Sequence, residues 1–344
     1  MALTTGLLVL PAHPAGRLTR IAQMAEALGY DYLWLADERF FREVYATLTL
    51  CALSTQRIKL GPCVTDPYSR HPALTAMAIA TLDEISGGRA VLGLGAGVSG
   101  FRELGISRER SGVALREAVE LIRRLLAGET VRYAGSTVRF EGGRLDFAPL
   151  RADIPVYIAA QRPVGCRVAG RVAEGAIMQG CVADRLLAFF RESVGAGAGA
   201  AGRDPAALDL VARINVCISD DRAAARQLMK PTIARSLAAQ RPDFFTFATA
   251  GLTVPPALAT RLQGLAYTHD ATALREVAGE IPEEFVDAVT LAGSPSDVAA
   301  GVIRLGRSGI TQFTVYPLDI DGRIETTIER FQREVMPAVR AAGL

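Results

Sequence analysis

The sequence predicts a (β/α)8 barrel, and three observations support this fold class. Eight short apolar segments are spread along the 344 residues, and a segment with helical periodicity follows each of them. The apolar segments lack polar alternation, which is typical of parallel strands buried on both faces. A closed barrel of this kind takes about 250 residues, so the chain is long enough to form one. A doubly wound open sheet is the second choice, because the number of strands favours closure.

The first half of the chain supplies four of the expected strands. "GLLVL" at 6–10 is a continuous apolar run, and an amphipathic stretch follows it as far as Leu28. "YDYLWLA" at 30–36 and "RIKLGPCV" at 57–64 are apolar runs of strand length, and "GRAVLGLGAG" at 88–97 ends in glycines. Helices are expected after these strands at 44–55, 71–85 and 111–126.

The second half supplies the other four strands by the same reasoning. "PVYIAA" at 155–160 and "GAIMQG" at 175–180 are short apolar runs, each followed by a helical stretch. "LDLVARINVCIS" at 208–219 is a longer one, and "ITQFTVYP" at 310–317 precedes a last helix. Strands that alternate with helices in this way indicate parallel pairing.

The residues beyond the usual barrel, about 90, are expected in two insertions within a single domain that spans 1–344. Residues 130–150 alternate apolar and polar side chains around several glycines, which predicts a small antiparallel hairpin. Residues 240–290 are irregular and contain prolines before a helical stretch. We expect this second insertion to form a lid over the site.

The composition excludes several functional classes. Lysine and arginine (38) nearly balance aspartate and glutamate (36), so the net charge of +2 indicates no nucleic-acid partner. The apolar N-terminal segment is too short to span a bilayer, and we expect neither a membrane anchor nor a signal peptide. Five scattered cysteines without CxxC spacing indicate free thiols in a reducing cytoplasm. His13, His71 and His269 fall at no ligand spacing, so no metal site is expected.

In such a barrel the active site lies at the C-terminal ends of the strands. Asp37 and Glu38 follow the second strand, where paired carboxylates serve either acid/base chemistry or an ion-paired loop with Arg39. His71 precedes Pro72 at the start of a helix, and it either donates to a substrate or caps that helix. These three side chains, Asp37, Glu38 and His71, are the catalytic candidates.

Two further strand ends carry binding signals. The glycines of "GLGAGVSG" at 93–100 let backbone N–H groups approach an anion or a ring closely, or they form a tight turn. In "AAQRPVG" at 159–165, Arg162 supplies a charge and Pro163 suits the first helical position, as a phosphate site requires. A solvated arginine at a helix start is the alternative. Cys63 has no basic partner nearby in sequence and is not expected to be a nucleophile.

Taken together, these segments resemble the luciferase-like flavin-dependent oxidoreductase superfamily, particularly its methylenetetrahydromethanopterin reductase-like branch. The resemblance is carried by "YLWLADERFFREVYATLTLCALSTQRIKLGPCVTDPYSRHPALTAMAIATLDEISGGRAVLGLGAG" and "FRELGI" (101–106). It continues in "IPVYIAAQRPVGCRVAGRVAEGAIMQG" (154–180) and in "GSPSDVAAGVIRLGRSGITQFTVYP" (293–317). These segments stand in the family's order and spacing.

The resemblance implies a barrel that binds deazaflavin coenzyme F-420, or alternatively FMN, at the strand ends. It implies a cis non-prolyl peptide bond between Cys63 and Val64, forming a bulge that presses on the flavin ring and is held by prolines and Asp66. A loop after the fourth strand is implied to flank the ring, and two segments are implied to bind phosphate. The cofactor-contacting residues that it implies are Cys63, Val64, Thr65, Asp66, Gly95, Ala96, Gly97, Val98, Gln161, Arg162, Pro163, Gln179 and Gly180.

Three positions depart from the family's pattern. Many relatives that use the deazaflavin carry a histidine where Glu38 stands, and many carry an aspartate where this chain has Val98-Ser99. Many have a glycine at the position of Arg162. The resemblance therefore specifies the superfamily much better than it specifies the reaction.

The leading functional hypothesis is hydride transfer between F-420 and a small organic substrate. Asp37 and Glu38 are the polar groups expected near that substrate, with Glu38 as the proton donor. The alternatives are an FMN-dependent monooxygenase that reacts with oxygen, and a catalytically silent barrel that only binds a flavin or another phosphorylated ligand. The apolar helices 44–55 and 71–85 are more hydrophobic than solvent-facing helices require, which predicts a homodimer through them.

Overall fold

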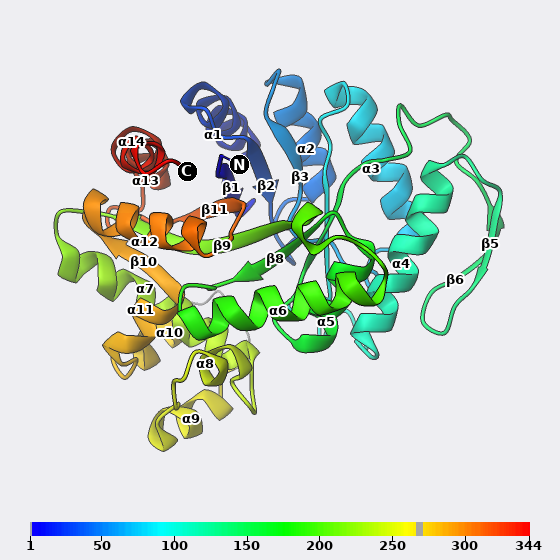
Figure 1. The fold of residues 1–344 in the computed structure, drawn as a ribbon. Coiled ribbons are helices and arrows are strands. Elements are labelled where there is room, and N and C mark those ends of the chain that lie inside the picture. The colour runs from blue at the N-terminus through cyan, green and yellow to red at the C-terminus, as the bar shows by residue number, and fades with distance from the viewer. Residues whose placement is uncertain (1, 266–270) are drawn as a thin grey trace. The chain divides into compact units, whose positions relative to one another are not determined.

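The computed structural model describes residues 2–265 and 271–344 (Figure 1). Its parallel strands follow the order β3-β2-β1-β11-β9-β8-β7-β4, and β10 pairs with β9. Each of the eight strands expected from the sequence is present on this path, so the predicted (β/α)8 barrel is confirmed. The strands are β1 (Thr4–Val9), β2 (Tyr32–Leu35), β3 (Lys59–Pro62), β4 (Leu92–Gly95), β5 (Val131–Ala134), β6 (Arg139–Gly143), β7 (Val156–Ala159), β8 (Gly175–Gln179), β9 (Asp209–Ile218), β10 (Thr290–Gly293) and β11 (Gln312–Pro317).

Helices follow the strands as the periodicity predicts. The first six are α1 (Ala15–Leu28), α2 (Val44–Leu53), α3 (Pro72–Ser86), α4 (Ser111–Leu126), α5 (Pro163–Val172) and α6 (Asp184–Ala200). They are followed by α7 (Arg222–Ala239), α8 (Phe245–Thr249), α9 (Pro256–Gln263), α10 (Ala271–Ala278), α11 (Glu283–Val289), α12 (Pro295–Arg307), α13 (Ile324–Arg330) and α14 (Met336–Ala341). Helix α1 ends at Gly29 and α3 at Gly87, both in the left-handed conformation that favours glycine.

The chain divides into two compact units. The first, here called the N-terminal unit, comprises Leu8–Ile177 and Ser193–Asp209. The second, the C-terminal unit, comprises Met1–Leu7, Met178–Glu192 and Leu210–Leu344. The divisions fall within β1, β8, α6 and β9.

Close backbone approach joins β3 to β4 within the N-terminal unit. Isolated parallel bridges link Leu60 with Ala90 and Thr65 with Leu94. The approach requires glycine, because a Cβ atom on Gly61 would lie 1.7 Å from the Val91 carbonyl oxygen. The strand end that the sequence fills with prolines and glycines is therefore packed directly against the next strand.

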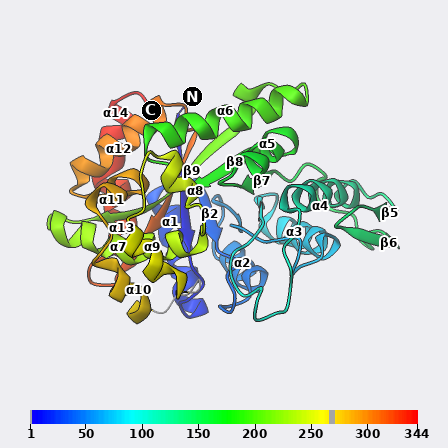
Figure 2. The ribbon, with the colours of Figure 1, turned by 90° about the horizontal axis from the view of Figure 1, so that it is seen from below.

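The segment 130–150 contains the antiparallel hairpin of β5 and β6, which lies beside α4 in both ribbon views (Figures 1 and 2). Glu117 on α4 is 3% exposed and accepts hydrogen bonds from the backbone N–H groups of Ser136, Thr137 and Val138 at 2.9 Å each. The hydroxyls of the first two donate to the same carboxylate. One buried carboxylate thus satisfies the turn of the hairpin.

In the C-terminal unit, residues 240–290 pack against α7, apart from 266–270, which lie outside the described residues. Met229, Ile233 and Leu237 of α7 form a buried cluster with side chains from α8 to α11, including Phe247 and Phe285. The two phenylalanine rings are stacked with centroids 5.4 Å apart. The described part of this segment is therefore a packed helical layer with its own share of the core.

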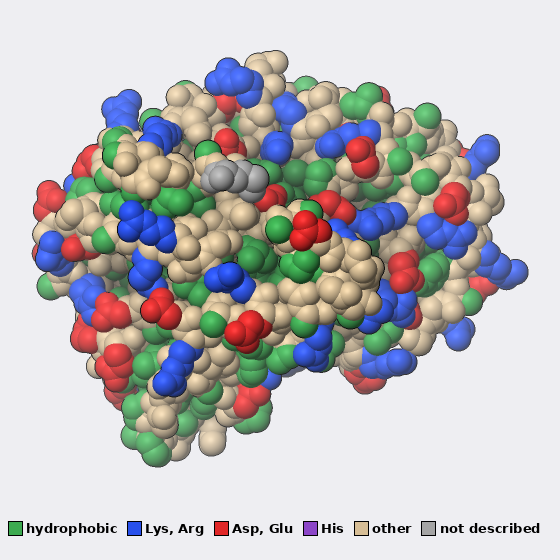
Figure 3. Space-filling model, viewed as in Figure 1, with side chains coloured by type: hydrophobic (Ala, Val, Ile, Leu, Met, Phe, Trp, Pro, Cys, Tyr) green, Lys and Arg blue, Asp and Glu red, His purple; other side chains and the backbone are tan. Residues whose placement is uncertain are grey.

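The surface agrees with the balanced composition. Lysine, arginine, aspartate and glutamate side chains are interspersed over the face drawn in Figure 3. Within the described ranges, 2–265 and 271–344, no helix combines the length and the apolar character that crossing a bilayer demands.

Candidate active site at the strand ends

The loop after β2 carries the first group of predicted site residues. Ala36 follows the last residue of β2, and its N–H donates to the Val9 carbonyl of β1 at 3.1 Å. Asp37, Glu38 and Arg39 come next in the chain. The Asp37 side chain is 12% exposed and that of Arg39 is 16% exposed. The Arg39 guanidinium donates to the Asp37 carbonyl oxygen at 2.7 Å and to its carboxylate at 3.1 Å. The ion-paired loop expected as one interpretation of this segment is present.

Burial raises the pKa of Asp37, and the charges of Arg39 and Arg70 together with the nearby Thr65 hydroxyl oppose that rise. Asp37 Oδ2 and Thr65 Oγ1 are both buried, and neither makes a hydrogen bond of normal geometry within the described part of the chain. A partly buried carboxylate with an unused oxygen is suited to exchange a proton or to accept one hydrogen bond from a ligand.

The end of β3 forms the bulge that the resemblance implies. The Cys63–Val64 peptide bond is cis, and so is the Arg39–Phe40 bond of the neighbouring loop. Cys63 N–H donates to the Leu35 carbonyl at 2.7 Å, and beyond the bulge Thr65 N–H donates to the Gly93 carbonyl at 3.0 Å. The bulge is therefore held between β2 on one side and β4 on the other.

Glycine at the end of β4 leaves room for this bulge. A Cβ atom on Gly95 would lie 2.4 Å from Cγ2 of Val64, which is closer than real side chains approach. The Gly95 N–H donates to the Thr65 carbonyl at 2.9 Å. Glycine at position 95 is thus required by the contact with Val64, which a turn alone would not explain.

Asp66 is 2% exposed and organises the loop behind the bulge. One carboxylate oxygen accepts from the N–H groups of Tyr68 and Ser69 at 2.8 and 2.7 Å. The other accepts from the Ser69 hydroxyl at 2.7 Å and from the Arg39 guanidinium. Asp66 therefore satisfies backbone N–H groups of the turn that follows the bulge, as an aspartate in a turn commonly does.

The loop after β4 lies against these residues. Gly97 has a φ of 65° and its carbonyl accepts a hydrogen bond from Arg108. Val98, at 50% exposure, and Phe40, at 68%, leave large apolar surfaces uncovered on the loops after β4 and β2. The tip of the Phe40 ring lies near Gly100, 3.6 Å from where its Cβ would stand. An apolar surface therefore borders the charged residues of the loop after β2.

His71 is the N-cap of α3. Its Nδ1 accepts a hydrogen bond from the Ala73 N–H at 3.1 Å, and its Nε2 lies 2.7 Å from the Arg139 carbonyl oxygen. Because Nδ1 accepts and the carbonyl requires a donor, the ring is the neutral tautomer protonated at Nε2. Of the two interpretations of His71, the helix cap is the one that these contacts support.

Helix α5 begins as the sequence predicts. Arg162 is its N-cap residue and is exposed, and Pro163 occupies the first helical position. Gln161, half-buried, precedes them after the end of β7. The helix N-terminus and the arginine thus present positive charge after the strand, as a phosphate site requires.

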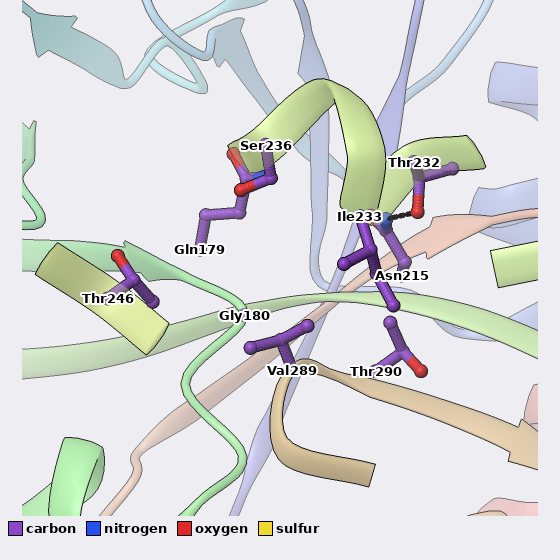
Figure 4. Close-up of a pocket in the computed structure, with 9 residues that line it drawn as sticks. All are labelled: Gln179, Gly180, Asn215, Thr232, Ile233, Ser236, Thr246, Val289 and Thr290. Atoms are coloured by element: carbon purple, nitrogen blue, oxygen red, sulfur yellow. Dashed lines mark hydrogen bonds between the residues drawn. The ribbon is translucent and has the colours of Figure 1, made fainter. Parts of the chain in front are cut away.

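Gln179 and Gly180 lie in the C-terminal unit, at the edge of a small pocket (Figure 4). The pocket is lined mainly by uncharged polar side chains, and Asn215 donates to the Thr232 hydroxyl at 2.8 Å within it. Figure 4 shows the Gln179 side chain extending toward the part of α7 that carries Ser236. These contacts between protein residues do not test phosphate binding, so the roles of Gln179 and Gly180 stay predictions.

Sequence reasoning missed the part played by Arg39 and Ser69 in tying the loop after β2 to the loop after β3. Arg39 appeared only as a neighbour of the two acids, and Ser69 carried no signal. The pairing with Asp66 spans 27 residues and forms only when adjacent strand ends meet.

The parallel strands, each followed by a helix, define the class of protein as a (β/α)8 barrel. Residues 3–312 match the sequence model of the luciferase-like monooxygenase family, and the chain belongs to this family. The resemblance inferred from the sequence is confirmed.

Three similar proteins have descriptions that name a reaction. The 5,10-methylenetetrahydromethanopterin reductase of Archaeoglobus fulgidus is 34% identical over 337 residues, which cover 97% of this chain and 99% of the relative. The F-420-dependent hydroxymycolic acid dehydrogenase of Mycobacterium tuberculosis is 36% identical over 226 residues, 61% of each chain. The solved structure of the coenzyme F-420 dependent tetrahydromethanopterin reductase from Methanopyrus kandleri matches with a TM-score of 0.85 at 28% identity, covering 98% of this chain and 99% of that one.

Proposed function

We propose that this protein is an oxidoreductase that transfers hydride between coenzyme F-420 and a small organic substrate. The observation that carries the proposal is the arrangement at the strand ends, where Gly95 leaves room for Val64 and the Asp37 carboxylate is only 12% exposed. Two similar proteins whose names state dependence on F-420 support it: the Methanopyrus kandleri reductase covers 98% of this chain, and the Mycobacterium tuberculosis dehydrogenase covers 61%. When bound, the deazaflavin supplies the hydride chemistry, and the protein supplies binding, orientation and proton handling.

The residues of the N-terminal unit suit such a cofactor. Gly95 carries no side chain that would collide with Val64. Asp37 Oδ2 and Thr65 Oγ1 offer buried polar atoms that a ligand can satisfy. The start of α5 with Gln161, Arg162 and Pro163 would hold a phosphate group. Gln179 and Gly180 are retained as proposed phosphate contacts on the resemblance alone.

Asp37 and Glu38 are the proposed proton-handling groups. Asp37 is buried beside Arg39, so its ionised form can accept a proton or a hydrogen bond from the substrate. Glu38, the next residue along the chain, is the proposed proton donor. Both lie in the loop after β2, where the strand end brings them to the site.

Binding of F-420 in preference to FMN is the first expected result. The purified protein, titrated with each cofactor and followed by fluorescence, should bind F-420 at least about tenfold more tightly. Redox turnover is then measured with secondary alcohols, ketones and methylene-bearing tetrahydropterins. Failure to bind either cofactor would contradict the proposal. FMN binding with oxygen consumption would identify a monooxygenase, and tight binding of F-420 without turnover of the panel would favour a silent barrel.

We propose that the protein forms a homodimer through α2 and α3. Their exposed large apolar side chains are Leu50, Leu53, Leu74, Met77 and Ile85, exposed between 38% and 66%. Such a cluster on two packed helices is typical of a self-complementary interface.

Light scattering should give twice the monomer mass, and Leu53→Glu should shift it to the monomer, because an exposed charge would have to be buried in the interface. Leu150→Glu is the matched control, since Leu150 is 57% exposed but lies outside both helices. A monomeric parent protein would overturn the proposed dimer.

We propose that the protein is located in the cytoplasm, because its cysteines are free thiols. All five are free, and Cys51, Cys166, Cys181 and Cys217 are buried. Free buried thiols are typical of a reducing compartment.

A further inference from the structure

Arg39 is a largely buried cation that bridges the loops after two strands. Its guanidinium donates to the carboxylate of Asp37 after β2 and to that of Asp66 after β3. It also donates to the Ser69 hydroxyl, which itself donates to Asp66. With its side chain only 16% exposed, Arg39 makes these contacts largely out of water, where charge-assisted hydrogen bonds are strongest.

A third strand end fixes the same residue. The Arg39 N–H donates to the Ser99 hydroxyl at 3.3 Å, and Gly100 packs against its aliphatic stem. A Cβ on Gly100 would lie 2.4 Å from Cβ of Arg39, so the loop after β4 closes on the arginine without space for a side chain. The loops after β2, β3 and β4 therefore meet at one residue, and only one of its contacts, the one with Asp37, is local in sequence.

Arg39 is the cation that contacts both carboxylates at this point. Asp37 and Asp66 influence each other unfavourably, and Arg39 touches both. Arg70 also acts on Asp37, but its own ion pair is with Glu43 at 2.6 Å. Without Arg39, two carboxylates with little solvent would face each other with no cation in direct contact. A lysine would restore the charge but not the planar fork that reaches both partners.

We propose that Arg39 is a positioning residue of the active site: its guanidinium couples the Asp37 carboxylate to the Cys63–Val64 bulge through Asp66. The group that handles protons and the surface that meets the cofactor then keep a fixed relation to each other. The proposal rests on the proposed function for its catalytic consequence, and on the contacts of Arg39 for its structural part. It explains why an aspartate and a serine follow the bulge in this chain.

The catalytic test compares Arg39→Met, Arg39→Lys and the control Arg132→Met. Arg132 lies on the hairpin, 77% exposed, and pairs with the exposed Glu141. Arg39→Met should lower kcat by about a hundredfold, the scale of a misplaced reacting group, with a much smaller change in the Kd for F-420. Arg39→Lys should recover part of kcat, and Arg132→Met should behave as the parent protein. Arg39→Met with parental kcat, in a protein of parental circular dichroism, would overturn the proposal.

A second measurement does not depend on turnover. In cofactor-free protein labelled with ¹³C at the aspartate carboxyl groups, the Asp37 signal is assigned by its loss in Asp37→Asn and titrated by NMR. Arg39→Met should move the Asp37 titration to higher pH, because a cation in contact is removed. Asp66→Asn should move it to lower pH, because a neighbouring negative charge is removed.

Opposite shifts are expected from charge coupling, and a purely structural role would produce neither. If neither variant moves the titration, the coupling through Arg39 is refuted even where the folded protein binds F-420. If the parent binds neither F-420 nor FMN while the titrations shift as expected, the proposed function fails and the coupling stands.

Discussion

Replacing Asp37 by asparagine is expected to lower kcat by two to four orders of magnitude, about the contribution of a positioned proton-transfer group. The substitution keeps the shape of the side chain and most of its contact with Arg39, but it removes the charge that accepts a proton. Steady-state oxidation of reduced F-420, or reduction of F-420, measures the loss, and the Kd for the cofactor should change little. Asp146→Asn is the matched control, because Asp146 is exposed in the same unit.

The direction in which kcat changes with pH provides a second check of the role of Asp37. Burial raises the pKa of Asp37, so the acidic limb of the kcat profile should lie above the ordinary aspartate value of about 3.9. The rate should fall as the pH drops through that raised pKa, since the protonated carboxyl no longer accepts. In Asp37→Asn the limb should be absent. Full activity of Asp37→Asn, or an unchanged limb, would exclude Asp37 from proton transfer.

Replacing Glu117 by glutamine is expected to destabilise the hairpin by about 3 kcal/mol near neutral pH. Hydrogen bonds from Ser136, Thr137 and Val138 outweigh the burial of this carboxylate and lower its pKa from 4.5 to about 2. Each unit by which the pKa in the folded state lies below that in the unfolded state contributes about 1.4 kcal/mol to stability. The stabilisation is complete above the unfolded pKa and is lost as the pH falls through the folded one. The effect of Glu117→Gln should therefore shrink toward pH 2.

Hydrogen exchange is the suitable measurement, because the hairpin can open locally without global unfolding. Protection of the amides at 136–138 should fall by about a hundredfold in Glu117→Gln. Glu141→Gln serves as the control, since Glu141 lies on the same hairpin with its side chain 80% exposed, and such pairs contribute less than about 1 kcal/mol. Equal protection in both variants would show that Glu117 does not anchor the turn.

The barrel could be predicted from the sequence because each strand can be recognised from its own residues. The run around Leu33 to Leu35 is apolar without alternation, and only a strand covered on both faces needs that pattern. The start of α5 was equally local, since Pro163 fits the first helical turn on its own chemistry. The cis bond at Cys63–Val64 came from the resemblance, as no local pattern specifies it.

What sequence reasoning missed depends on contacts between distant segments. Nothing near Asp66 in the chain indicates that its partner is Arg39, and Glu117 gives no sign on α4 that it accepts from a hairpin turn. The short strand β10 was missed because its four residues, "TLAG", are too few to give a local signal at the end of the segment 240–290, and its pairing with β9 defines it. His71 had two interpretations until Ala73 and Arg139 were found at its nitrogens.

The exposed apolar pair Phe40 and Val98 has a practical consequence for engineering. The hydrogen bonds that hold the loop behind the bulge join Arg39, Asp66 and Ser69, and the side chains of Phe40 and Val98 take no part in them. Random substitution at positions 40 and 98 therefore leaves these hydrogen bonds intact while altering the surface beside them. A library built on these two codons is the natural starting point for changing which compounds the protein accepts.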